Sequence, residues 1–184
     1  MRVRIGEVFK VKRGTTPSTK IKEFWDTPDV FFVSGREVNW NHINRADKSL
    51  SKVVFERTAH TIRPTETVLL TSNGKAGILK VPAFHNDQVI GILSADSKVD
   101  PKFLFYFFML NHANVQKLEH GISGHAFDNE KVRSLRIPFP SFREQLQIVK
   151  EIESRFALVS SIEKLQNDFE LLKKVALKET FSFP

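Results

Sequence analysis

The sequence that decides the architecture spans residues 137–145 and reads Ile137-Pro138-Phe139-Pro140-Ser141-Phe142-Arg143-Glu144-Gln145. The two prolines disfavour helix before Ser141 and keep the backbone extended there. Ser141 is a favourable N-cap, and Glu144 three residues later completes a capping box. From here to about Leu177 the chain has neither Gly nor Pro, which predicts one helix of roughly 35 residues and about 50 Å. Because so long a helix cannot bury itself in one small domain, it predicts a partner.

Charge divides the chain into two parts. The 184 residues fit one domain of ordinary size with an appendage, and 41% of them are hydrophobic, enough for a core. Residues 1–142 contain 21 basic and 14 acidic residues, a net charge of +7, whereas residues 143–184 contain seven of each. A basic head favours a polyanionic partner, above all nucleic acid, with a merely basic soluble protein as the alternative. The neutral second part is typical of a dimerising helix.

Cysteine usage and hydropathy restrict the compartment. The sequence has no Cys, which excludes a disulfide scaffold and thiolate chemistry and agrees with a reducing cytoplasm. The first residues lack the apolar run of a signal peptide, and no apolar stretch reaches 18 residues. We therefore expect a soluble cytoplasmic protein with no membrane partner.

Short segments rich in β-branched and aromatic residues predict a head built mainly from strands. Asp100 and Pro101 predict the start of a buried helix that runs to Leu110. Alternation over residues 2–12 predicts a short strand or turn followed by a strand. Further strands are expected at residues 30–33, 52–55, 67–71, 78–81, 89–93 and 135–137. The expected fold class is α+β: a β-rich head over 1–141, a long helix over 142–178 and a frayed end over 179–184.

Residues 13–20 form a loop of hydroxyl and cationic side chains without an acid, Arg13-Gly14-Thr15-Thr16-Pro17-Ser18-Thr19-Lys20. Small hydroxyls and backbone N–H groups can approach phosphate oxygens closely, and two cations supply charge. An ordinary polar loop is the alternative. The candidate phosphate contacts are Arg13, Thr15, Thr16 and Lys20.

Residues 36–45 are dense in amides and also contain an aromatic residue and two arginines. Amide side chains can bond base edges bidentately, so this segment is a candidate for base reading. A tight turn with an Asx cap would use the same residue types. The candidate DNA contacts here are Arg36, Asn39, Trp40 and Asn41.

A glycine turn, Ser72-Asn73-Gly74-Lys75-Ala76-Gly77, lies between two predicted strands and indicates a β-hairpin. The glycine and lysine spacing of a P-loop is absent. As a basic hairpin tip, the turn could enter a groove of DNA through Asn73 and Lys75.

The long helix carries apolar residues at alternating steps of three and four, as in a coiled coil. The step from Val159 to Ile162 is three where the heptad expects four, so the apolar seam slips phase once. A helix packed along its own head is the alternative to a helix pair. The candidate dimerisation residues are Val149, Ile152, Phe156, Val159, Ile162, Leu165, Phe169 and Leu172.

Together these stretches resemble the specificity subunit of type I restriction-modification systems. The segment 5–9 with 13–17 resembles the start of its target recognition domain, and 68–74 resembles a central strand and turn of that domain. The most specific likeness is the segment 137–145 with Ile148, Val149 and Ile152, which resembles the junction to the spacer helix. The resemblance implies a target recognition domain over residues 1–141 and a coiled-coil helix after it.

The resemblance implies recognition of double-stranded DNA for a partner methyltransferase subunit and a possible restriction subunit. The family's usual subunit has two recognition domains and two helices, whereas this sequence shows no internal repeat, so we expect a half-subunit that forms a homodimer and reads a bipartite, palindromic site. Loop 121–127 differs from the family's common Gly-Thr-Gln-like wording; its candidate DNA contacts are Ser123 and His125.

No catalytic signature is found in the sequence itself. The amino-methyltransferase motif, a cofactor loop and paired histidines are absent, so S-adenosylmethionine, Mg²⁺ and ATP are expected only on partner subunits. A metal-dependent nuclease is one alternative, because Pro28-Asp29 with Asp96-Ser97-Lys98, or with Asp100-Pro101-Lys102, imitates a restriction-nuclease pattern. A coiled-coil adaptor that never touches DNA is the other.

Overall fold

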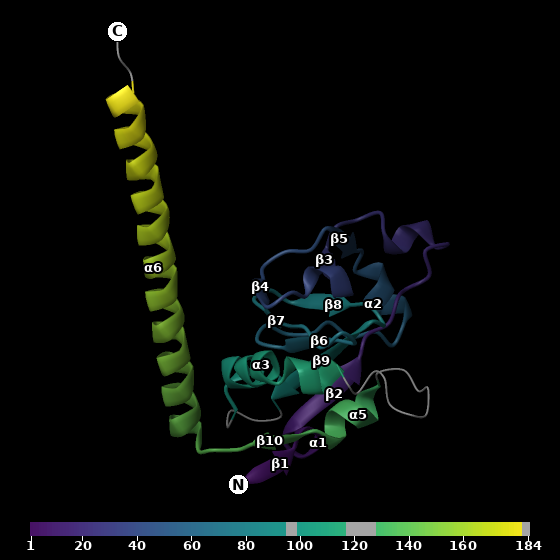
Figure 1. Cartoon of the computed structure of the whole chain (residues 1–184). Helices are drawn as coiled ribbons and strands as arrows, with labels where there is room; N and C mark the ends of the chain where they lie inside the picture. Colours follow the sequence, from purple (N-terminus) through teal and green to yellow (C-terminus); the bar gives the residue numbers. More distant parts are fainter. Residues whose placement is uncertain (95–98, 117–127, 182–184) are drawn as a thin grey trace. The chain divides into compact units, whose positions relative to one another are not determined.

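A computed structural model describes residues 1–94, 99–116 and 128–181 (Figure 1). The chain separates into two compact units, a head over Met1–Gln145 and a helix from Leu146 onward.

The head contains all the strands of the described chain and several short helices. Its strands are β1 (Arg2–Arg4), β2 (Phe9–Arg13), β3 (Val30–Val33), β4 (Asn41–Ile43), β5 (Lys48–Leu50), β6 (Val68–Thr71), β7 (Ala76–Leu79), β8 (Ala83–His85), β9 (Val89–Ser94) and β10 (Arg136–Pro138). Its helices are α1 (Ile5–Val8), η1 (Lys22–Phe24), η2 (Gly35–Glu37), α2 (Val53–Arg57), α3 (Pro101–Leu110), α4 (His112–Gln116) and α5 (Asn129–Ser134). The long helix is α6 (Phe142–Phe181).

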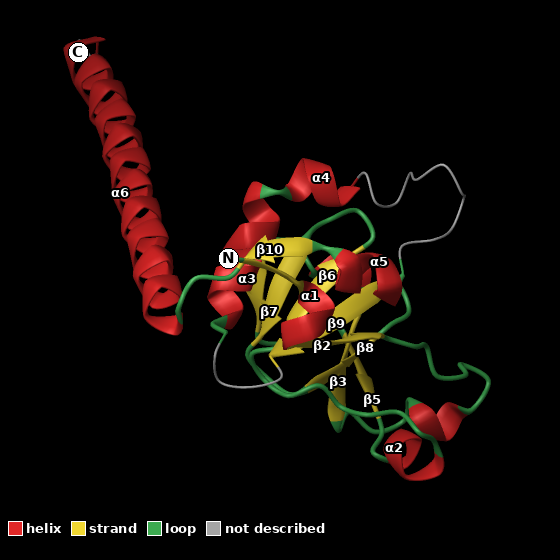
Figure 2. Cartoon of the chain, turned by 90° about the horizontal axis from the view of Figure 1, so that it is seen from below, coloured by secondary structure: helices red, strands yellow, loops and turns green. Residues whose placement is uncertain are grey.

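Three sheets organise the head (Figure 2). A five-stranded sheet has the order β2-β9-β6-β7-β4, a three-stranded sheet has the order β5-β3-β8, and β1 pairs with β10. The β6–β7 and β6–β9 pairs are antiparallel, whereas β4 joins β7 and β3 joins β8 in parallel. The α+β prediction is confirmed.

Both faces of the five-stranded sheet are covered at its centre, and the alternation of side chains along β6 explains how. Val68 and Leu70 belong to a core cluster that also contains Leu104 and Phe108 of α3. Leu69 points to the other face and packs with residues of the three-stranded sheet, among them Val33. Every residue of β6 and β7 is therefore buried.

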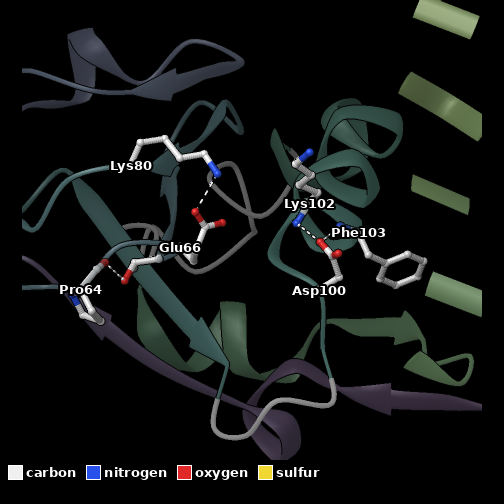
Figure 3. A network of polar contacts seen from close by, with 7 residues as sticks. Pro64, Glu66, Lys80, Asp100, Lys102 and Phe103 are labelled. Carbon is white, nitrogen blue, oxygen red and sulfur yellow. Dashed lines mark hydrogen bonds and ion pairs between the residues drawn. The ribbon is translucent and has the colours of Figure 1, made fainter. Parts of the chain in front are cut away.

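Local chemistry fixes the starts of two helices as predicted. Asp100 caps α3, its carboxylate accepting hydrogen bonds from the N–H groups of Lys102 at 2.7 Å and Phe103 at 3.4 Å (Figure 3). Before α6, the N–H of Ser141 donates to Glu144 at 2.8 Å and the N–H of Glu144 donates back to the Ser141 hydroxyl at 3.4 Å. The Ser141 hydroxyl, which donates to the Glu144 carboxylate at 2.6 Å, and the Ser141 N–H together lower the pKa of the Glu144 carboxyl from its usual value. The capping box is confirmed.

One predicted strand is wrong. Residues 53–55 belong to helix α2 and Lys52 is its N-cap, although Val53 and Val54 are β-branched. Ser51 precedes this turn, and its carbonyl accepts the N–H of Val54 at 3.1 Å. Val54 is fully buried in a satellite core with Phe24 and Phe84, so tertiary packing outweighs strand propensity here.

The second unit, from Leu146 onward, contains the main part of α6, whose 40 residues run from Phe142 to Phe181. The structure contains the helix predicted over 142–178, and residues 179–181, which were predicted to be frayed, are helical as well. Intrahelical ion pairs join Arg155 to Glu151 at 2.6 Å and Lys173 to Glu170 at 3.0 Å. None of the helices in the described part of the chain is long and apolar enough to cross a membrane.

Candidate nucleic-acid interface

A cavity of about 530 Å³ in the head gathers polar side chains from distant parts of the sequence. We call it the recognition cavity. Three of its lining residues are cationic and none is acidic. It is lined by Arg13, Gly35, Arg36, Val38, Asn39, Thr71, Ser72, Asn73, Lys75 and Gln88.

The β6–β7 turn supplies Asn73 and Lys75. The backbone N–H of Lys75 donates to the Thr71 hydroxyl at 3.1 Å, and the Thr71 N–H donates to the Lys75 carbonyl at 2.9 Å. Gly74 has φ +79°, a left-handed conformation that suits glycine, and an added Cβ would lie 3.0 Å from His112. The turn is therefore held by hydrogen bonds at its base, and Lys75 lines the cavity.

The segment around η2 supplies Arg36 and Asn39, and Glu37 organises it. The Glu37 carboxylate accepts the N–H of Ser34 at 2.7 Å and the N–H of Asp47 at 2.8 Å. Asn41 holds the same segment, because its amide donates to the Glu37 carbonyl at 3.1 Å and accepts the Asn39 N–H at 2.9 Å. The side chains of Glu37 and Asn41 therefore hold the backbone of this segment through hydrogen bonds.

Arg36, Asn39 and Lys75 retain free polar side chains. None of the three makes a side-chain hydrogen bond to another residue within the described ranges. Cationic and amide groups that are held in place but not paired can bond phosphate oxygens and base edges. The recognition cavity is therefore suited to a nucleic-acid ligand.

The residue after Asn39 has a strained backbone. Trp40 has φ 56°, a left-handed value that is unusual for a bulky side chain and costs on the order of 1–2 kcal/mol. Its N–H donates to the Ala76 carbonyl at 2.7 Å, and its ring makes edge contacts with Phe105 and His112. The indole thus packs on the core and fixes the position of Asn39.

Arg13 is the last residue of β2, and the loop that follows it depends on a close approach between two backbone segments. The N–H of Gly14 donates to the Val89 carbonyl at 2.9 Å. An added Cβ on Gly14 would lie 2.1 Å from the carbonyl oxygen of His85, which leaves room only for glycine. The Arg13 guanidinium donates to the carbonyl of Asp87, whose carboxylate accepts the Thr16 hydroxyl at 3.0 Å.

His85 contacts the backbone of this loop. Its backbone carbonyl accepts the N–H of Thr15 at 3.2 Å, and its side chain is buried. Burial, reinforced by the positive charge of Arg63, lowers the pKa of His85 from 6.5 to about 4. His85 is therefore neutral at physiological pH, and the loop that begins at Gly14 packs against an uncharged imidazole.

The structure brings five of the predicted DNA contacts into one cavity, namely Arg13, Arg36, Asn39, Asn73 and Lys75. Thr16 lines an adjoining cavity of about 420 Å³ that shares Arg36 and Gln88 with the first. Asn41 lines a third cavity of about 360 Å³.

The remaining predicted contacts lie elsewhere. The Thr15 hydroxyl is 3.3 Å from the His60 ring, Lys20 is exposed, and Trp40 packs against the core. Ser123 and His125 lie outside the described residues.

Sequence reasoning missed Gln88 and Ser72 as lining residues. Gln88 follows Asn86-Asp87 in the short connection between β8 and β9, and it reaches the recognition cavity only because β9 pairs with β2. An exposed glutamine in a polar turn is a weak signal, although its amide is the type of group that reads adenine.

Two carboxylates of the alternative nuclease pattern, those of Asp29 and Asp100, have structural roles in the head. Asp29 accepts the N–H of Lys52 at 2.9 Å, and Asp100 caps α3. Residues 96–98 of the pattern lie outside the described ranges. Within those ranges, no group of three His, Cys, Asp or Glu side chains is placed to hold a metal ion.

Residues 1–171 match the family described as type I restriction modification DNA specificity domain. The chain belongs to this family. A specificity domain is not a methyltransferase or nuclease domain, which agrees with the prediction that the chain is a non-catalytic component.

Individual relatives of this specificity family support the assignment. The chain is 28% identical over 183 residues to the type I restriction enzyme MjaIX specificity subunit of Methanocaldococcus jannaschii, covering 95% of this chain and 41% of that protein. It is 21% identical to the EcoR124I/EcoR124II specificity subunit of Escherichia coli, covering 92% and 44%. The chain thus spans less than half the length of these relatives.

Solved structures share the fold. The HsdS subunit from Thermoanaerobacter tengcongensis superposes with a TM-score of 0.73 at 14% identity, covering 98% of this chain and 44% of that one. A subunit of a type I restriction-modification complex gives 0.73 at 16% identity, covering 95% and 43%. The specificity-domain fold, strands followed by a long helix, is therefore shown.

Proposed function

We propose that this specificity-family chain binds double-stranded DNA through the recognition cavity and reads part of its sequence. The observation that carries the proposal is the convergence of Arg13, Arg36 and Lys75 with the amides of Asn39 and Asn73 in one acid-free cavity. Bidentate pairing of arginine with guanine, and of asparagine with adenine, is the direct way to read base edges. The +7 net charge adds long-range attraction for the duplex.

The polar residues of the recognition cavity fall into two groups, one that positions the DNA and one that reads its bases. Arg13 is anchored to the Asp87 carbonyl at the end of a strand, and Lys75 is a single point charge on a rigid turn. These two suit phosphate contacts, which fix register without carrying sequence information. Arg36 and Asn39 are exposed and have fork-shaped polar groups, so we assign them to base reading.

We further propose that α6 forms a homodimer. Of the predicted dimerisation residues, Val149 is already buried in the single chain at 5% exposed. Those from Phe156 to Leu172 are between 46% and 68% exposed, which leaves a long apolar stripe uncovered in a single chain. A second α6 would cover this stripe by coiled-coil packing. The pair would present two heads to DNA, so the site would be bipartite and, for two identical heads, palindromic.

The chain would then act for partner subunits in the cytoplasm. A specificity chain without its own catalytic groups needs a methyltransferase to modify the site, and S-adenosylmethionine would be held by that partner. A restriction subunit that uses Mg²⁺ and ATP is the further partner proposed by the same reasoning. No cofactor is assigned to this chain.

The test is binding of fluorescent duplex DNA by the purified chain across a series of salt concentrations. We expect the logarithm of the DNA association constant to fall linearly with the logarithm of the salt concentration. Lys75→Ala should reduce the magnitude of this slope by about 0.9. Arg36→Ala should weaken binding mainly of the preferred duplex. Lys52→Ala, an exposed lysine outside the cavity, is the matched control. Absence of salt-dependent binding would favour the adaptor, and Mg²⁺-dependent cleavage by the pure chain would favour the nuclease.

A further inference from the structure

The head has a second basic hollow, which we call the β2 cleft. Its volume is about 510 Å³, and four of its lining side chains are cationic while none is acidic. None of these four cations was selected as a DNA contact from the sequence. The cleft is lined by Gly6, Phe9, Lys10, Val11, Lys12, Arg63, Gly91, Leu93 and Arg133.

Strand β2 places the two lysines. Side chains alternate along a strand, so Phe9 and Val11 enter the core while Lys10 and Lys12 remain exposed. Lys12 pairs across the sheet with Gly91, whose missing side chain leaves the space that the buried His85 ring occupies. A Cβ on Gly91 would lie 2.7 Å from His85 Nε2.

Arg133 reaches the cleft from α5 because Gly6 allows a close approach. A Cβ on Gly6 would lie 2.9 Å from the Cβ of Arg133. The Arg133 guanidinium donates to the Val11 carbonyl at 3.3 Å and pairs with Glu130 at 2.9 Å. Its charge is therefore partly balanced, and the lysines carry most of the unbalanced charge of the cleft.

Arg63 is the cation that most needs a partner. Its backbone pairs with Ala83 in both directions, which holds the residue beside β8. Its Nε is buried and has no hydrogen-bond partner within the described chain. Burial lowers the pKa of Arg63, which reflects the cost of keeping this charge away from water. An anion in the cleft would offset that cost.

We propose that the β2 cleft binds backbone phosphates of the same DNA duplex, outside the bases contacted from the recognition cavity. This inference rests on the proposed function. Strand β2 links the two sites, because Arg13 at its end lines the recognition cavity and Lys10 and Lys12 line the cleft. Three strand residues span about 10 Å, and a duplex carries one negative charge per roughly 1.7 Å of axis, so phosphates of a bound duplex continue past the cavity.

The experiment compares two duplexes for which the wild-type chain has a measured salt slope. One contains only the preferred site, and the other extends it by about one helical turn, roughly 10 base pairs, on each side. We expect the double substitution Lys10→Gln with Lys12→Gln to make the slope shallower by about 1.8 on the longer duplex only. Base preference should not change. Lys22→Gln with Lys52→Gln, exposed lysines elsewhere in the head, is the control for net charge.

The other outcomes distinguish a failure of this inference from a failure of the proposed function. Equal slopes for wild type and the Lys10, Lys12 variant on the longer duplex would overturn the inference while leaving the proposed function intact. Unchanged DNA binding with weaker retention of a methyltransferase subunit would overturn it in favour of an acidic protein surface. A wild-type chain that binds neither duplex would instead refute the proposed function. Arg63→Gln provides a second variant and should weaken binding of the longer duplex in the same way.

Discussion

The side-chain carbonyl of Gln145, in the first turn of α6, accepts a hydrogen bond from the backbone N–H of Asp100 at 3.0 Å. The Gln145 amide donates in turn to the Pro140 carbonyl at 3.0 Å, and the side chain is completely buried. Gln145 therefore ties the start of the long helix to the N-cap of α3, two elements that are far apart in the sequence.

Substituting Gln145 with alanine should destabilise the head. The change leaves the Asp100 N–H and the Pro140 carbonyl without their partner, which costs about 1–3 kcal/mol each when such groups stay buried. Urea unfolding of the full chain measures the loss. Gln147→Ala, an exposed glutamine two residues later, is the control and should change stability by less than about 0.5 kcal/mol. Equal effects would show that the buried bonds contribute nothing.

Gly14→Ala should be far more damaging than Gly35→Ala, although both glycines line or adjoin the recognition cavity. The new methyl group at residue 14 would lie 2.1 Å from the backbone oxygen of His85, whereas at residue 35 it meets nothing closer than 3.6 Å. Overpacking of this kind costs about 1–3 kcal/mol or more. We expect a lower melting temperature and weaker DNA binding for Gly14→Ala alone. A well-folded Gly14→Ala chain with normal binding would contradict the loop geometry.

Stability should depend on the protonation of His85. Its folded-state pKa of about 4 lies below its ordinary 6.5, so the unfolded chain binds more protons between these values. The stability from keeping His85 neutral is thus present above pH 6.5 and is lost as the pH falls to about 4. The loss is at most about 3 kcal/mol.

The measurement is the pH dependence of thermal unfolding for wild type and His85→Asn. The two curves should converge as the pH falls from about 6.5 to 4, because the variant lacks this proton linkage. The difference in melting temperature between wild type and variant removes the contribution that carboxylates such as Glu144 make to the pH dependence, because both chains contain them. Parallel curves for His85→Asn and wild type would exclude a buried neutral His85.

The dimer proposal predicts a contrast between two exposed leucines of α6. Leu165 is 68% exposed and lies on the predicted seam, whereas Leu171 is 61% exposed and lies off it. By light scattering, wild type and Leu171→Lys should have twice the 21.1 kDa chain mass, and Leu165→Lys should be monomeric. A monomeric wild-type chain would mean that α6 has a different partner.

Local sequence signals predicted the parts of this fold that depend on neighbouring residues. Ser141 with Glu144, Asp100 with Pro101, and Gly74 each act within one turn, so their types reveal the helix starts and the hairpin. The β-branched Val53 and Val54 predicted a strand but lie in a helix, because their packing in a satellite core decides their conformation.

The candidate sites were predicted only in part, for the same reason. Loops rich in Arg, Asn and Lys could be identified one by one, but their meeting in the recognition cavity depends on sheet pairing between distant strands. Gln88 and Arg63 are isolated polar residues in the sequence, and only the pairing of β9 with β2 and of Arg63 with Ala83 gives them a place in a site.

The central claim is that the recognition cavity reads DNA sequence. The most direct measurement is selection of bound duplexes from a random library by the wild-type chain and by Asn39→Ala, followed by sequencing. We predict that wild type enriches one palindromic, two-part motif and that Asn39→Ala loses preference at one position in each half, at a cost of about 1–3 kcal/mol. If wild type enriches no motif, or if Asn39→Ala selects the same motif with the same strength, the cavity does not read sequence as proposed.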